Sequence, residues 1–114
     1  MVVPAVGEVV LVPFPFSDLS QTKLRPAICL ANVGRGDWIL CQITSNQFGD
    51  QKAVKLLHSD FATGLLRTDS YARPGKLFTA HSSLLVRSIG RLTQPAQQRI
   101  AQAIVGLLQG AISP

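Results

Sequence analysis

The stretch that decides the fold is residues 25–44, RPAICLANVGRGDWILCQIT. Two mostly apolar runs, residues 25–31 and 38–44, flank the sequence VGRGD at residues 33–37. Gly and Asp are typical of tight turns between strands. The pattern therefore predicts two antiparallel strands joined as a hairpin.

The hairpin brings polar side chains to one end of the predicted sheet. A turn centred near residues 34–35 places Arg25 roughly opposite Thr44, with their Cβ atoms about 5 Å apart. A guanidinium group can hold two phosphate oxygens, and the hydroxyls of Thr44 and Ser45 can bond a phosphate oxygen or a ribose hydroxyl. This group therefore suits a phosphodiester. The alternative is a surface arginine and an ordinary threonine at a strand end.

Further strands are predicted on both sides of the hairpin. Residues 7–14 precede it, and residues 53–57, 69–77 and 86–92 follow it. The third of these, DSYARPGKL, is an extended segment interrupted by Pro-Gly. Because strands and helices do not alternate along the chain, a parallel sheet is not expected.

A C-terminal helix is predicted after Thr93, an N-cap residue with Pro95 in the first turn. The sequence thus predicts one mainly β domain over residues 1–114, a small, strongly bent antiparallel sheet or partly open barrel capped by the helix. One apolar face of the helix has i, i+3, i+4, i+7, i+8 spacing and consists of Ile100, Ala103, Ile104, Leu107 and Leu108.

Composition and charge limit the function classes. Hydrophobic residues make up 46% of the chain, and no apolar run is long enough to span a bilayer, so we expect a soluble, cytoplasmic domain that does not bind membranes. The net charge is +5, and all six acidic residues lie at or before position 69. The acid-free remainder, with five basic residues, favours a polyanion or an acidic protein as partner.

Cofactor and metal motifs are absent from the sequence. There is no GxGxxG, no P-loop and no G-x-S-x-G, and no short pairing of Cys or His that is typical of a metal site. No cofactor and no metal are therefore expected. Cys29 and Cys41 lie in apolar strands, where free thiols are expected to pack in the core.

Several motifs, in order, carry a family resemblance. They are GEVVLVPFPFSDLSQTKLRPAICLA from residue 7, CQITS from residue 41, SYARPGKLF from residue 70 and VRSIGRLTQPAQQRI from residue 86. Together they resemble the PemK/MazF-type toxins of type II toxin–antitoxin systems, over residues 7–108. The resemblance implies an SH3-like barrel with a C-terminal helix, a homodimer, and an acidic antitoxin as partner.

The resemblance also implies an activity. Members of this family are metal-independent endoribonucleases that cleave single-stranded RNA, often mRNA, by attack of the ribose 2′-hydroxyl on the adjacent phosphate. By analogy, Arg25 stabilises the phosphate and the transition state, and Thr44 is an orienting hydroxyl. Ser45 is implied as a helper in substrate binding.

The chain departs from the family at one motif. Many members carry R-T-x-D after the fifth strand, where this chain has Phe78-Thr79-Ala80-His81. Arg73, Lys76 and His81 are candidates to replace the missing pair, and Arg73 and Lys76 are also candidate contacts to the phosphate backbone. The alternatives are a solvated loop and a histidine at a strand end.

Two aromatic residues lie in polar loops beside the Arg25 and Thr44 segments. Phe16 and Phe48 are candidates to stack unpaired bases, an interaction worth about 1–3 kcal/mol per base. The alternative, favoured for Phe16, is that each ring anchors its loop in the core. Two other functions stay open from the sequence: a non-catalytic RNA- or protein-binding module of the same family, and a generic SH3-like interaction domain.

Overall fold

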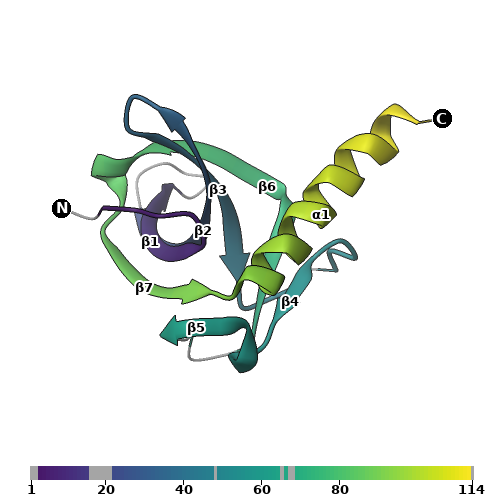
Figure 1. Ribbon diagram of the computed structural model, residues 1–114, viewed down its shortest axis with the longest axis horizontal. Helices are drawn as coiled ribbons and strands as arrows, with labels where there is room; N and C mark the ends of the chain where they lie inside the picture. Colours follow the sequence, from purple (N-terminus) through teal and green to yellow (C-terminus); the bar gives the residue numbers. More distant parts are fainter. Residues whose placement is uncertain (1–2, 16–21, 48, 65, 67–68, 114) are drawn as a thin grey trace.

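The computed structural model describes residues 3–15, 22–47, 49–64, 66 and 69–113. These residues form one seven-stranded antiparallel sheet in the order β4-β6-β3-β2-β1-β7-β5, which curls into a half-barrel (Figure 1). The prediction of a mainly β fold with a C-terminal helix is confirmed. The elements are β1 (Glu8–Pro15), β2 (Thr22–Gly34), β3 (Asp37–Thr44), β4 (Val54–Leu56), η1 (His58–Asp60), β5 (Phe61–Gly64), β6 (Ser70–His81), η2 (Ser82–Leu84), β7 (Arg87–Leu92) and α1 (Gln94–Ile112).

The β2–β3 hairpin is closed by a two-residue turn. Gly34 lies opposite Asp37, and the intervening Arg35 and Gly36 have φ values of 58° and 82°. Two successive positive φ angles twist the chain in the sense that an antiparallel hairpin requires. The predicted turn is confirmed, although its centre lies one residue later than the sequence suggested.

Two register shifts in β2 compensate for this displacement. They occur between Cys29 and Ala31 and between Asn32 and Gly34, and each adds one residue to β2 relative to β3. Beyond them, Ala27 lies opposite Gln42. If this register continued for two more residues, it would place Arg25 opposite Thr44, as the sequence predicted.

Strand β6 runs through the Pro-Gly sequence that was expected to interrupt it. Ile43 of β3 lies opposite Ala72, and Cys41 lies opposite Leu77, so residues 73–76 of β6 face the single residue Gln42. Pro has no N–H to donate to a ladder, which favours such an irregularity at this point. The Sγ–H of Cys41 donates to the Arg73 carbonyl at 3.1 Å, which holds the irregular segment against β3.

The core has two clusters, one on each face of the curled sheet. Val9, Ile28, Cys41 and Ile43 pack with residues of α1, while Val10, Ala27, Cys29 and Leu40 pack on the other face. Both cysteines are free and fully buried, as predicted. Burial disfavours the thiolate and raises the pKa of each thiol to about 12, so both are inert as nucleophiles at neutral pH.

Helix α1 is capped and anchored at its N-terminal end. Thr93 Oγ1 accepts a hydrogen bond from the Ala96 N–H at 3.3 Å. One turn further on, Arg99 forms an ion pair with the buried Asp60 at 3.0 Å. The helix then extends past the sheet, as Figure 1 shows, and Leu108 is 57% exposed. Within the described residues, no helix is both long and apolar enough to span a membrane.

Candidate functional site

A pocket of about 290 Å³ opens where β2 begins and β3 ends. The β2–β3 ladder stops at Ala27 and Gln42, so Arg25 and Thr44 lie two residues beyond its last pair. The pocket occupies this position instead of a further ladder pair. The structure thereby brings Arg25, Thr44 and Ser45 together, as the hairpin predicted. The lining residues are Lys23, Leu24, Arg25, Pro26, Ile43, Thr44, Ser45, Leu66 and Ser70.

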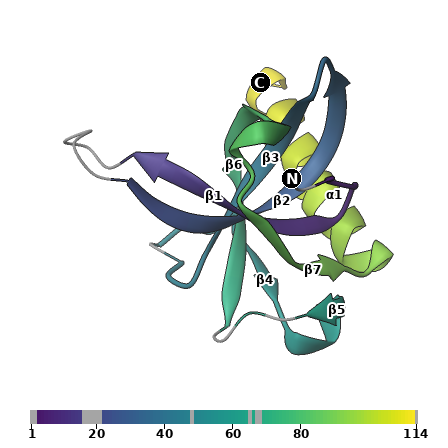
Figure 2. The same ribbon diagram turned by 90° about the vertical axis from the view of Figure 1, so that its left-hand side faces the viewer.

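The backbone of Arg25 is held by β1. Arg25 lies opposite Val12 in an unbroken antiparallel register that extends to the end of both strands. Figure 2 shows β1 and β2 running side by side out from the rest of the sheet. Arg25 is half-buried on this arm, and the position of its backbone is fixed by sheet pairing.

Thr44 is the last residue of β3 and is almost completely buried, with 4% exposure. Its Oγ1 accepts a hydrogen bond from the Asn46 N–H at 3.2 Å, and its backbone lies opposite Tyr71 of β6. A threonine hydroxyl that accepts a bond can still donate its own hydrogen. The loop that follows β3 therefore binds the Thr44 oxygen and leaves its hydrogen able to donate.

Ser70 is a lining residue that the sequence did not single out. It is the first residue of β6, 4% exposed, and directly precedes the residue opposite Thr44. A third hydroxyl therefore lines the pocket, beside those of Thr44 and Ser45. Its place depends on the β3–β6 pairing, which joins segments far apart in the chain, and no local signal could have revealed it.

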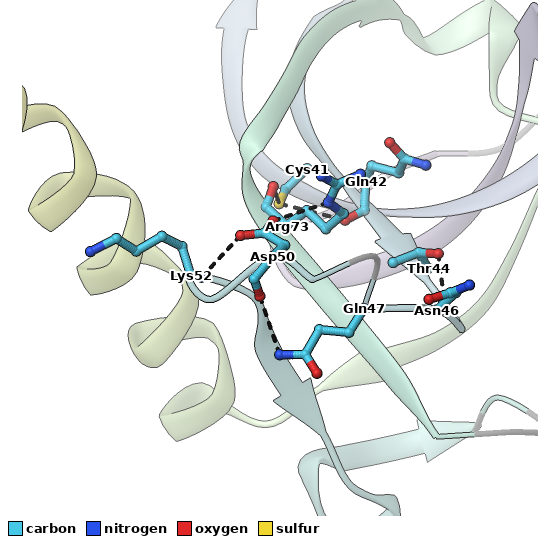
Figure 3. Close-up of polar contacts among 8 residues, drawn as sticks. All are labelled: Cys41, Gln42, Thr44, Asn46, Gln47, Asp50, Lys52 and Arg73. Carbon is cyan, nitrogen blue, oxygen red and sulfur yellow. Dashed lines mark hydrogen bonds and ion pairs between the residues drawn. The ribbon is translucent and has the colours of Figure 1, made fainter.

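The loop between β3 and β4 is organised by Asp50 (Figure 3). Its Oδ1 accepts from the Lys52 N–H at 2.9 Å, and its Oδ2 accepts from Arg73 Nε at 3.0 Å. The Gln47 side chain donates to the Asp50 carbonyl at 3.2 Å. The loop that begins at Ser45 is thus tied to the irregular segment of β6.

Arg73, which the sequence suggested as a contact to phosphate, forms an ion pair with Asp50. The Arg73 and Asp50 side chains are only 20% and 17% exposed. The hydrogen bond from Arg73 is the main reason why the pKa of Asp50 lies below its usual range. In the structure the Arg73 guanidinium therefore offsets a carboxylate of its own chain.

We expect Asp50→Asn to reduce the stability of the domain by about 1–3 kcal/mol at neutral pH, because the charged hydrogen bond to Arg73 is lost. A carboxyl with a lowered pKa stabilises the fold fully above its unfolded pKa of about 4, and this contribution declines as the pH falls through the lower folded value. Urea unfolding at several pH values measures this. The difference between wild type and variant should shrink below about pH 4, and a difference independent of pH would contradict the assignment.

The other candidates from the sequence lie away from the pocket. Lys76 is exposed in the irregular segment of β6 and is not among the lining residues. His81 lies opposite Asp37, at the far end of β3 from Thr44, about 23 Å along the strand for seven residues. Its Nδ1 accepts from the Ser83 N–H at 3.1 Å and caps η2. The structure therefore does not bring His81 to Arg25 and Thr44 of the same chain.

The departure from the R-T-x-D motif has a packing explanation. Phe78, where many family members have Arg, packs edge to face against Phe14 with ring centroids 4.7 Å apart. Both rings are partly buried and pack against the second core cluster. Phe16 and Phe48 lie outside the described residues, so their predicted stacking role stays a prediction.

Among the described residues, no three His, Cys, Asp or Glu side chains gather in a way that could hold a metal ion. The described residues that line the pocket supply hydroxyl and cationic groups and no carboxylate. Such a site can bind and polarise an anion. It suits the phosphodiester chemistry expected from Arg25 and Thr44.

The chain shares its fold with known structures. It is similar to a crystal structure of MazE–MazF from Deinococcus radiodurans, with 19% identity, a TM-score of 0.73, and 96% of this chain and 98% of that chain covered. It is also similar to an endoribonuclease in complex with its cognate antitoxin from a mycobacterial species, with 18% identity, a TM-score of 0.69, and 96% of both chains covered. No curated protein sequence matches the chain.

The family follows from the sequence itself. Residues 5–108 match the model of the PemK-like, MazF-like toxins of type II toxin–antitoxin systems. The chain belongs to this family. The resemblance stated from the motifs is thereby confirmed, over nearly the same residues.

Proposed function

We propose that the protein is a metal-independent endoribonuclease toxin that cleaves single-stranded RNA, including mRNA. The observation that carries this proposal is the pocket that Arg25 and Thr44 line together at the adjoining ends of β2 and β3. Family membership supports a toxin. One mycobacterial structure with the same fold is itself described as an endoribonuclease.

The proposed reaction exchanges one phosphate ester bond of the RNA for another, with water accepting the first proton and donating the second. The ribose 2′-oxygen loses its proton and bonds to the adjacent phosphorus, the bond from phosphorus to the 5′-oxygen breaks, and that oxygen takes up a proton. Arg25 holds two phosphate oxygens and offsets the charge that grows on them in the transition state. Thr44 orients the phosphate or ribose through its hydroxyl, and Ser45 assists in binding.

The proposed partners follow from charge and family. The described residues after position 69 include five basic residues and no acidic one, which suits an acidic antitoxin. Among the similar structures, the Deinococcus MazF was solved with MazE. We propose that this protein is also a cytoplasmic homodimer that a cognate antitoxin inhibits. Light scattering of the isolated protein tests whether it is a dimer.

Incubation of the purified protein with single-stranded RNA in EDTA tests the activity. We expect cleavage products that end in a 2′,3′-cyclic phosphate, with a 5′-hydroxyl on the downstream fragment. RNA that is bound but not cut would favour a non-catalytic module, an alternative that Phe78 in place of the family arginine supports. An affinity for RNA that is independent of salt, or absent, would favour a protein-binding domain.

A further inference from the structure

We infer that Lys23 binds the phosphate next to the scissile one, so that the pocket holds two successive phosphates of the RNA strand. Lys23 lines the pocket with Arg25 and Thr44, and its role is not implied by the family motifs. The inference rests on the proposed endoribonuclease function and adds the number of phosphates that the site takes.

The first argument is the geometry of β2. Lys23 lies opposite Phe14 and Arg25 lies opposite Val12, in the same unbroken register with β1. Residues two apart in a strand point to the same face and are separated by about 7 Å. This separation is comparable to the distance between neighbouring phosphates along an extended RNA strand. A strand that places one phosphate on Arg25 therefore places the next within reach of the flexible Lys23 side chain.

The second argument is electrostatic. Lys23 is exposed, and among the described residues it has no ion pair. No described acidic residue lines the pocket that could neutralise it. The positive charge of Lys23 can thus attract a bound anion. The ion pairs of the described residues lie elsewhere and are Lys55–Asp69, Arg73–Asp50, Arg91–Glu8 and Arg99–Asp60.

The two cations have different chemical tasks. The planar fork of Arg25 matches the phosphate whose charge distribution changes during reaction, whereas Lys23 is a point charge suited to a phosphate that stays unchanged. A contact of equal strength in the ground state and the transition state lowers KM and leaves kcat unaltered. Lys23 should therefore contribute to binding alone.

The test uses Lys23→Gln with Lys55→Gln as the matched control, since Lys55 is also an exposed lysine but pairs with Asp69 outside the pocket. With a single-stranded oligonucleotide that the wild type cleaves, Lys23→Gln should raise KM about tenfold at unchanged kcat. The slope of log affinity against log salt concentration should become shallower by about 0.7. Lys23→Arg should restore most of the binding, and Lys55→Gln should resemble the wild type.

Replacing single phosphates of the oligonucleotide by neutral methylphosphonates identifies the phosphate that Lys23 contacts. A methylphosphonate at the phosphate that Lys23 binds should weaken the wild type and leave Lys23→Gln unaffected, whereas one at a more distant phosphate should weaken both proteins equally. Equal effects at every position, or a loss of kcat in Lys23→Gln, would overturn the inference. If the wild type cleaves no RNA, the proposed activity fails separately, and the same comparison made on dissociation constants still decides whether Lys23 contacts a phosphate.

Discussion

Arg25→Ala is expected to lower kcat/KM for RNA cleavage by about 10²–10³-fold, the usual cost of removing one donor to a developing oxyanion. Arg25 lines the pocket with Thr44, and its backbone is fixed by pairing with β1. The loss should appear mainly in kcat, because the guanidinium group contributes most when charge grows on the phosphate oxygens. Cleavage of a labelled oligonucleotide under single-turnover conditions measures this.

Two further variants separate charge from geometry. Arg25→Lys keeps the charge and loses the two-point fork, so it should recover only a minor part of the rate. Arg87→Ala removes an exposed arginine of β7 outside the pocket and should leave the rate near that of the wild type. If both alanine variants lost activity equally, net charge would be the cause and Arg25 would have no special role. Unchanged cleavage by Arg25→Ala would remove it from the catalytic site.

The hairpin shows how much of the site could be predicted from the sequence. Apolar runs around VGRGD gave two strands and a turn, and these local signals are strong. Arg25 and Thr44 line one pocket, as the hairpin predicted, but the register that brings them to the same end of the sheet has a cause that the sequence does not contain. Without the two register shifts in β2, the turn at Arg35 and Gly36 would place Ala27 opposite Thr44. Bulges depend on the curvature of the whole sheet and leave no clear local pattern.

Pairings between distant strands could not be predicted. Strand β5 adds to the sheet edge beside β7, and β6 joins Ser70 and Tyr71 to the end of β3. The same long-range pairing places His81 at the opposite end of β3. The strand propensity of a segment does not indicate such contacts, because they arise from burial in the folded sheet. Residues such as Ser70 that complete the pocket were therefore missed, and the candidate His81 lies away from the pocket of the same chain.

A large loss of stability is expected from a substitution in the C-terminal helix. Ile100→Ala is expected to reduce the free energy of unfolding by about 2–5 kcal/mol, because its fully buried side chain packs with Val9, Ile28 and Leu92 in the core between sheet and helix. Deleting three carbon atoms there loses burial and leaves a cavity. For a domain of this size the melting temperature should fall by roughly 10 °C or more.

Leu108→Ala is the matched control, because both residues belong to the one apolar face that the helical spacing predicts. Leu108 lies two turns further on, and its side chain is 57% exposed. Its truncation should change the stability of the isolated chain by less than about 0.5 kcal/mol. Equal destabilisation by the two substitutions, measured by urea unfolding at low protein concentration, would contradict this packing. A loss for Leu108→Ala that grows with protein concentration would instead mean that a second copy of the chain covers the exposed end of α1.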